Sequence, residues 1–183
     1  MRIRKATVAD AAAIAAVHVR SWQAAYRGLL PREFLDGLDT ARRQEGWARG
    51  LAADEWPRAG VLVAEQDDQV RGFVGVGPAR DAGADPAHVA ELAAIYLLPE
   101  AWGQGMGRLL MARAVEAMTS AGYQRASLWV LDTNARARRF YEAAGWHADG
   151  ASKTDSSWGV PLSEVRYQIS LTGSAPAPEE AGS

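Results

Sequence analysis

Three alternating glycines stand where an apolar run ends and a helical periodicity begins. Gly103, Gly105 and Gly107 follow the run 88–98 and a proline at position 99. Glycine allows a backbone to approach a ligand closely, and the unpaired N–H groups of a first helical turn favour an anion. The segment is therefore a candidate cradle for a pyrophosphate. The alternative is a turn that only packs a strand against a helix.

Spacing excludes two common nucleotide-binding loops. A dinucleotide-binding turn requires Gly-x-Gly-x-x-Gly, and Leu110 stands where the third glycine belongs. A nucleoside-triphosphate loop ends in Gly-Lys-Ser or Gly-Lys-Thr, whereas Arg108 and Leu109 follow Gly107. Neither class of nucleotide-binding protein fits the sequence.

A second candidate group lies in the helix-like segment 134–146, where Asn134 and Tyr141 are seven residues apart. Two helical turns take about seven residues, so both side chains are expected on one face, where a single extended ligand could meet them. Asn134 alone also fits a helix cap, and Tyr141 alone also fits a half-buried packing residue. Together, and downstream of the glycines, they favour a binding site.

Both segments resemble signatures of the GNAT superfamily of N-acetyltransferases. Its acetyl-coenzyme A (acetyl-CoA) motif, Arg/Gln-x-x-Gly-x-Gly/Ala, is similar to Trp102-Gly103-Gln104-Gly105-Met106-Gly107, with Trp102 in place of the polar first residue. Its second signature, Asn-x-x-Ala-x-x-Phe-Tyr-x-x-x-Gly-Phe, is similar to the segment from Asn134 to Trp146. In element order the resemblance spans about residues 2–171.

The resemblance implies an α/β (α+β) fold, with a mixed central sheet of about seven strands flanked by about four helices. The fourth and fifth strands are expected to splay and admit a pantetheine arm. The cosubstrate implied is acetyl-CoA, and the residues expected to bind it are Ile95, Tyr96, Leu97, Trp102, Gly103, Gln104, Gly105, Met106, Gly107, Arg108 and Asn134. Of the arginines beside the two motifs, one or two could meet the 3′-phosphate as bidentate partners: Arg108, Arg136, Arg138 and Arg139.

The family pattern also implies roles for single residues. Tyr141 is expected near the coenzyme sulfur as general acid, the Leu97 N–H is expected to face the thioester oxygen, and Asn134 is expected to hold the pantetheine. Acyl transfer to an amine further requires a neutral amine and a stabilised oxyanion. Because the chain has no cysteine to relay the acyl group, direct attack in a ternary complex is predicted.

Glu91 is the candidate general base, because an alkylammonium with a pKa near ~10.4 must lose a proton before it can attack. Strand alternation predicts that Glu91 shares a face with Ala93, Ile95 and Leu97. The alternative is a solvated or ion-paired strand carboxylate.

The acceptor site is expected, by the same resemblance, at the first two helices and the loop between the last strands. Trp22, Tyr26 and Trp158 are its candidate substrate-binding residues, although Trp22 also fits a core stripe. The predicted acceptor is a primary amine of a small molecule or the amino group of a peptide. A non-catalytic sensor module that binds acyl-CoA is the alternative function.

The remaining sequence supplies the elements that must position these residues. Alternation predicts a strand from Arg2, and helical spacing predicts a helix ending near Gly28 and a second helical segment over 32–51. A hairpin is expected over 61–76, around an Asp67-Asp68 turn. The other predicted elements are a strand over 88–98, a helix from Gly105 or Gly107 to Gly122, a strand over 126–131, a helix over 134–144, and final strands from Trp146 and over 164–171.

Composition and charge limit the number of domains and the kinds of partner that this protein can have. The 183 residues, 48% hydrophobic and 23% charged with a formal net charge of −2, fit one domain at 1–171 and a disordered tail at 172–183. The acidic balance favours neither nucleic acid nor an anionic membrane as a partner. With no cysteine and three histidines, no metal site is expected. No signal or membrane-spanning segment is visible, so we expect a cytoplasmic protein, with a homodimer left open.

Overall fold

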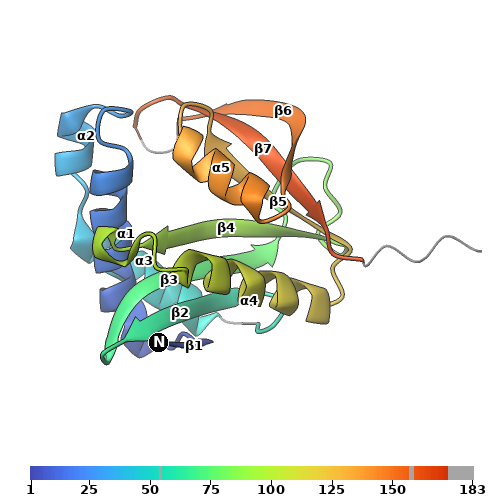
Figure 1. The fold of residues 1–183 in the computed structure, drawn as a ribbon, viewed down its shortest axis with the longest axis horizontal. Coiled ribbons are helices and arrows are strands. Elements are labelled where there is room, and N and C mark those ends of the chain that lie inside the picture. The colour runs from blue at the N-terminus through green and yellow to red at the C-terminus, as the bar shows by residue number, and fades with distance from the viewer. Residues whose placement is uncertain (54, 157–158, 173–183) are drawn as a thin grey trace, which may run out of the picture.

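The computed structural model describes residues 1–53, 55–156 and 159–172, and one seven-stranded sheet runs through them (Figure 1). Its strands are β1 Arg2–Lys5, β2 Gly60–Gln66, β3 Gln69–Pro78, β4 Val89–Leu97, β5 Arg125–Leu131, β6 His147–Asp155 and β7 Leu162–Ser170. Their order is β1-β2-β3-β4-β5-β7-β6, and only the β4–β5 pair is parallel. The expected mixed sheet is confirmed. Trp158 and residues 173–183 of the predicted tail lie outside the described residues.

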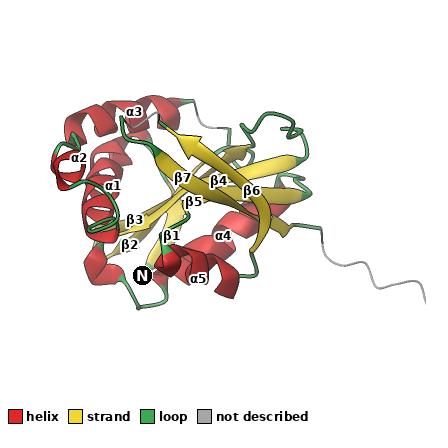
Figure 2. Cartoon of the chain, turned by 90° about the horizontal axis from the view of Figure 1, so that it is seen from above, coloured by secondary structure: helices red, strands yellow, loops and turns green. Residues whose placement is uncertain are grey.

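Helices cover both faces of this sheet (Figure 2). On one face lie α1 Ala11–Ala25 and α3 Thr40–Ala52, with the short α2 Arg32–Asp36 beside α1. On the other face, α4 Met106–Ser120 and α5 Ala135–Ala143 share one core with the sheet. Short 3₁₀ turns at Val8–Asp10 and Pro99–Ala101 precede α1 and α4. We refer to the two sides as the α1 face and the α4 face.

The structure divides one predicted helical segment in two. The segment 32–51 is predicted as one helical element, but it forms α2 and α3, so the described residues hold five α-helices where about four are expected. Helix α2 ends at Gly37, and α3 begins after its N-cap residue, Asp39. The Asp39 carboxylate accepts hydrogen bonds from the N–H groups of Ala41 and Arg42 at 2.8 and 3.2 Å. An aspartate in this position is a favourable helix N-cap.

The tight hairpin between β2 and β3 is confirmed. Asp67 and Asp68 both have positive φ, at 53° and 56°. This is the backbone geometry of a two-residue turn whose twist matches that of the flanking strands. The turn fixes the register of β3, which in turn positions β4.

The predicted splay between β4 and β5 is also confirmed. These strands pair only where Val89–Glu91 of β4 run beside Arg125–Ser127 of β5. Beyond Glu91 the two strands separate, and each continues for several residues toward its carboxyl end. The sheet is therefore open in its middle along the last six of the nine residues of β4.

A bulge interrupts β4 just where this opening begins. Gly75 of β3 pairs with Ala94, and Val76 pairs with Leu92, so Ala93 is an extra residue in β4. An extra residue reverses which side chains face which side of a sheet. Leu92 accordingly packs in the core on the α4 face, whereas Ala94 packs against the core on the α1 face.

The bulge corrects the predicted orientation of Glu91. Ile95 and Leu97 pack toward the α4 face, and Tyr96 packs toward the α1 face. Glu91 precedes the bulge, so it shares the α1 face with Tyr96 and not the face of Ile95 and Leu97. The prediction from simple alternation is wrong because it assumes an unbroken strand.

Candidate active site

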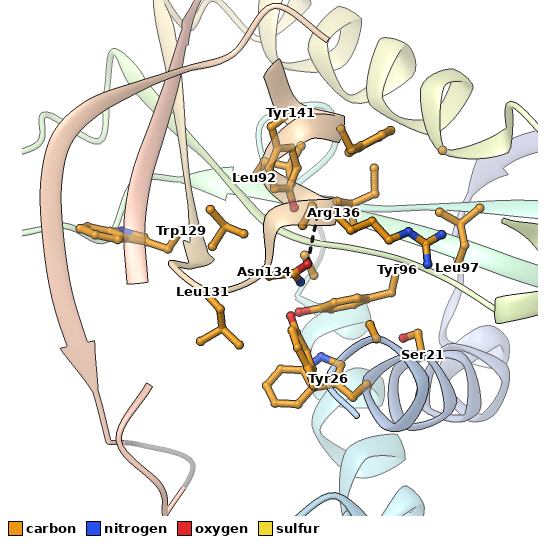
Figure 3. Close-up of a pocket in the computed structure, with 18 of the residues that line it drawn as sticks. Ser21, Tyr26, Leu92, Tyr96, Leu97, Trp129, Leu131, Asn134, Arg136 and Tyr141 are labelled. Carbon is orange, nitrogen blue, oxygen red and sulfur yellow. Dashed lines mark hydrogen bonds between the residues drawn. The ribbon is translucent and has the colours of Figure 1, made fainter. Parts of the chain in front are cut away.

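One cavity of about 410 Å³ passes through the opening between β4 and β5. On the α4 face it is lined by Leu97, Trp102, Gly105, Arg136 and Tyr141, and on the α1 face by Trp22, Tyr26, Glu91, Trp129 and Glu164. Figure 3 shows side chains from both sides converging on it. We call the end on the α4 face the glycine compartment and the end on the α1 face the acceptor compartment.

The glycine compartment is built on the start of α4. Gly105 is the N-cap residue, with φ of +81°, and Gly103 has φ of +75°; an added Cβ at either position would meet nothing within 4 Å. Gly107 differs, because a Cβ there would lie 3.3 Å from Phe140 and 3.4 Å from Leu97. Gly103 and Gly105 therefore shape an open turn, while Gly107 allows α4 to pack closely against α5.

Most of the predicted coenzyme-binding residues line this cavity. Those that do are Ile95, Tyr96, Leu97, Trp102, Gly103, Gly105, Gly107, Arg108 and Asn134. The side chain of Met106 is instead fully buried in the core, and the Gln104 side-chain amide donates a hydrogen bond to the Glu100 carbonyl oxygen at 2.6 Å. At Met106 only the main chain is left to meet a ligand, and the Gln104 side chain is held by its hydrogen bond to the 3₁₀ turn before α4.

Trp102 occupies the position where the GNAT motif has a polar residue. Its indole Nε1 donates a hydrogen bond to the Leu97 carbonyl oxygen at 3.0 Å, which ties the turn to the end of β4. The guanidinium carbon of Arg136, from the first turn of α5, lies 3.7 Å from the centre of the Trp102 ring. Arg136 and Arg108 line the cavity; Arg138 instead donates hydrogen bonds to the Tyr167 hydroxyl and the Asp132 carbonyl oxygen.

Asn134 and Tyr141 lie together on the cavity side of α5, as their spacing predicts (Figure 3). The Asn134 Oδ1 accepts a hydrogen bond from the Ala137 N–H at 3.1 Å, so this residue is a helix N-cap as well as a cavity residue. Tyr141 is buried, and burial raises the pKa of its hydroxyl well above the ordinary value. A phenol in this environment keeps its proton at neutral pH and is available as a donor.

Glu91 lines the cavity but is held in an ion pair. Arg80 Nε and Nη2 donate to its two carboxylate oxygens at 3.0 and 2.6 Å, and the Arg80 main-chain N–H adds a third bond at 3.2 Å. Only 10% of the Glu91 side chain is exposed. The structure thus shows the ion-paired carboxylate that was the alternative to a base, and the assignment of Glu91 as base stays a prediction.

The acceptor compartment has aromatic walls. Trp22 and Tyr26 extend from α1, and Tyr26 shares a hydrogen bond with Tyr96 of β4. Trp22 packs with Leu131 and Leu162 in a small apolar cluster, so it serves both the core and the cavity. Burial raises the pKa of the Tyr26 and Tyr96 hydroxyls.

Charged residues on β6 and β7 complete this compartment, and motif analysis does not reveal them. Glu164 of β7 and Lys153 of β6 line the cavity, with 3.6 Å between the Lys153 Nζ and the Glu164 carboxylate. The Lys153 Nζ also lies 4.1 Å from the centre of the Trp129 ring. The sequence signal for Glu164 is a polar residue at every second place along β7, at Glu164, Arg166, Gln168 and Ser170, which marks one face of a strand.

Comparison with known proteins gives the class to which this fold and site belong. A family model described as the acetyltransferase (GNAT) family matches residues 20–146. Over 134 residues the chain is 34% identical to the uncharacterized N-acetyltransferase YuaI of Bacillus subtilis, with 72% of each chain covered. The chain belongs to the GNAT family of N-acetyltransferases, which are acyltransferases.

Solved structures confirm the fold. PaiA N-acetyltransferase from Thermoplasma acidophilum, in complex with coenzyme A, superposes with a TM-score of 0.76 at 21% identity, covering 92% of this chain and 98% of that one. YncA from Salmonella typhimurium, with its cofactor acetyl-CoA, superposes with a TM-score of 0.71 at 24% identity, covering 98% of both chains. In the described part of the present chain, no cluster of His, Cys, Asp and Glu is arranged to hold a metal ion. No helix there is long and apolar enough to cross a bilayer.

Proposed function

We propose that this protein transfers an acetyl group from acetyl-CoA to a primary amine of a small molecule or peptide, by direct attack in a ternary complex. One observation carries the proposal: a single cavity crosses the sheet through the β4–β5 opening. A thioester entering from the glycine compartment and an amine entering from the acceptor compartment would meet inside it. The coenzyme complexes of the two related structures support the choice of carrier.

The glycine compartment fits the diphosphate of such a carrier. Gly103 and Gly105 leave open space before the helix, and the N–H groups of the first turn of α4 point out of its positive end. Arg108 and Arg136 line the same compartment and add positive charge. The pantetheine would then run beside Leu97 and Asn134 into the β4–β5 opening.

The chemistry requires no covalent enzyme intermediate. The amine nitrogen attacks the thioester carbon, the carbon–sulfur bond breaks, and the leaving thiolate takes a proton from the Tyr141 hydroxyl. The nitrogen loses an N–H proton to give the neutral amide, and that proton restores the Tyr141 hydroxyl. Main-chain N–H groups of the splayed part of β4, including that of Leu97, would stabilise the oxyanion. Glu91 is the base that the motifs suggest, although its ion pair with Arg80 weakens that assignment.

Release of the free coenzyme A thiol tests the proposal. Purified protein and acetyl-CoA are mixed with a panel of alkylamines, arylalkylamines, polyamines, amino acids and short peptides, and thiol is measured with a chromogenic disulfide. At least one amine is expected to raise thiol release above the rate without amine, with the N-acetyl product identified by mass spectrometry. Stabilisation by acetyl-CoA without turnover for any amine would instead favour the non-catalytic sensor.

A further inference from the structure

We propose that Glu164 pairs with the ammonium group of the acceptor and takes its proton, and that the acceptor is a primary amine carried on an uncharged, apolar substituent. This inference rests on the proposed acetyl transfer and deepens it. It assigns the proton acceptor to β7 rather than to the strand that carries the coenzyme motif. Four features of the acceptor compartment lead to it.

The first feature is position along the β4–β5 opening. Glu91 lies opposite Ser127, at the closed end where the two strands still pair. Glu164 lies opposite Leu131, the last residue of β5, at the end where β4 and β5 have separated. Paired residues of antiparallel strands share a face, so Glu164 faces the cavity together with Leu131.

The second feature is the set of partners that each carboxylate has. The Arg80 guanidinium forms a bidentate ion pair with both carboxylate oxygens of Glu91, and the Arg80 main-chain N–H donates a third hydrogen bond to the same carboxylate. The only ion pair found for Glu164 among the described residues is the 3.6 Å contact with Lys153. Its side chain is 17% exposed, which is enough to meet a ligand from the cavity. A second ammonium can approach Glu164 without breaking a bidentate pair.

The third feature is the electrostatic surroundings of Glu164. Burial raises its pKa, Asp155 and Glu91 raise it further, and Lys153 opposes them. The charge of Glu164 also acts on the hydroxyls of Tyr26 and Tyr96, in the same compartment. A carboxylate with a raised pKa is a stronger base than an ordinary surface glutamate.

The fourth feature is the chemistry of the walls. Trp22, Leu131 and Leu162 form an apolar cluster at the compartment, with Tyr26 and Tyr96 packed against it. The Lys153 ammonium lies over the Trp129 ring, so an ammonium is already accommodated beside Glu164. Arg80 and Lys153, the cations that line this compartment among the described residues, already face carboxylates. The walls therefore favour a monoamine with an apolar substituent over an amine that also carries a carboxylate.

In the proposed step one N–H proton of the bound ammonium passes to a Glu164 carboxylate oxygen. The freed nitrogen lone pair attacks the thioester carbon, and the carbon–sulfur bond breaks. The sulfur receives its proton from Tyr141. The nitrogen, now bonded to the acetyl carbon, loses its second N–H proton, which restores the Tyr141 hydroxyl, and Glu164 returns its proton to solvent. The products are the neutral amide and the coenzyme A thiol with one proton released, so the cycle balances without a further reactant.

The test compares Glu164→Gln with Glu91→Gln, with phenethylamine as the probe amine and phenylalanine as its carboxylated counterpart. Wild-type protein is expected to acetylate phenethylamine with a kcat/KM at least about tenfold above that for phenylalanine, and this kcat/KM should level off above pH 7. Glu164→Gln should lower it about 100-fold at pH 7. The loss should shrink about tenfold per pH unit up to pH 9, because the fraction of neutral amine rises by that factor.

Glu91→Gln is expected to keep the wild-type pH profile, because Glu164 still takes the proton. Glu116→Gln, at an exposed carboxylate of α4 outside the cavity, is the control expected to leave kcat/KM unchanged. Calorimetry of phenethylamine with the protein saturated in coenzyme A adds a readout without turnover, and Glu164→Gln should weaken that binding. Thermal melting and acetyl-CoA affinity check folding; should Glu164→Gln not fold, Glu164→Asp replaces it and is expected to keep the profile at a lower kcat.

Three results would overturn the inference: an unchanged pH profile in Glu164→Gln, the pH-dependent loss in Glu91→Gln instead, or neither binding nor acetylation of phenethylamine by the wild type. If other amines of the panel are acetylated while phenethylamine is not, only this inference fails. If no amine supports thiol release, the proposed function itself fails.

Discussion

Arg136 stacks on Trp102, with 3.7 Å between its guanidinium carbon and the centre of the indole ring. The two residues come from opposite sides of the glycine compartment, Arg136 from the start of α5 and Trp102 from the turn before α4. Trp102 stands where the family motif has a polar side chain. Because Trp102 carries no charge, Arg136 supplies the cation at this position by stacking on the indole ring. This contact leads to the first prediction.

Arg136→Ala should weaken acetyl-CoA binding about tenfold, because it removes a stacked cation from a site that must hold phosphate. Arg139→Ala is the matched control, since Arg139 is an exposed arginine of the same helix that, unlike Arg136, does not line the cavity. Calorimetric titration with acetyl-CoA measures both. Equal effects of the two substitutions would show that the stack has no part in coenzyme binding.

Tyr141→Phe should lower kcat about 100-fold or more and leave acetyl-CoA affinity nearly unchanged, because only the proton donor is lost. Tyr123→Phe makes the same chemical change at a buried tyrosine, whose hydroxyl donates to the Arg58 carbonyl oxygen at 3.0 Å. Steady-state thiol release compares them. A Tyr141→Phe enzyme with the activity of Tyr123→Phe would remove Tyr141 from the chemistry.

Gly105→Ala should destabilise the fold by about 1 kcal/mol, because alanine is strained at φ of +81°. Gly122→Ala should cost about as much, since Gly122 has φ of +85° at the other end of α4 and equally open space for a Cβ. Only Gly105→Ala should also reduce acetyl-CoA affinity, because its methyl group projects into the space before the helix. Urea unfolding and calorimetry separate the two effects; equal affinities would contradict a ligand site at this turn.

His18 makes folding stability depend on pH. It is buried on α1, stacked on the Tyr96 ring at 5.0 Å, and its Nδ1 accepts a hydrogen bond from the Trp47 indole at 3.2 Å. Burial, with a smaller contribution from Arg43, lowers its pKa to about 3. The unfolded chain binds this proton near pH 6.5, so the stabilisation is complete above that pH and is lost progressively as the pH falls toward 3.

The wild type should therefore lose about 2 kcal/mol of unfolding free energy between pH 7 and pH 5 through this group. His18→Gln keeps an acceptor for Trp47 but cannot titrate, so its loss over the same interval should be smaller by about that amount. Urea unfolding at the two pH values measures the difference. Parallel losses in the two proteins would place the pH dependence elsewhere.

The sequence predicted the parts of the fold that local chemistry determines. The glycines at 103–107, the Asp67-Asp68 turn and the seven-residue spacing of Asn134 and Tyr141 each determine a local geometry, and the structure has it. The break at Gly37 was missed, because one glycine inside a helical pattern often leaves the helix intact. Asp39, a favourable N-cap, was the signal that could have revealed it.

The acceptor compartment was less predictable, because long-range pairing builds it. The bulge at Ala93 leaves no mark in an apolar strand, yet it decides which face Glu91 occupies. Glu164 reaches the cavity only through the pairing of β7 with β5 and the separation of β5 from β4. Neither relationship is encoded by residues near one another in the chain.

The central claim is that the turn before α4 binds the diphosphate of acetyl-CoA. Calorimetric titration of the wild-type protein with acetyl-CoA and with S-acetylpantetheine, which has the same thioester and arm but no diphosphate, tests it most directly. We predict one acetyl-CoA per chain and, for S-acetylpantetheine, at least about tenfold weaker binding, since charge-assisted hydrogen bonds contribute about 1.5–3 kcal/mol each. Equal affinities for the two ligands, or no heat with acetyl-CoA, would contradict the account.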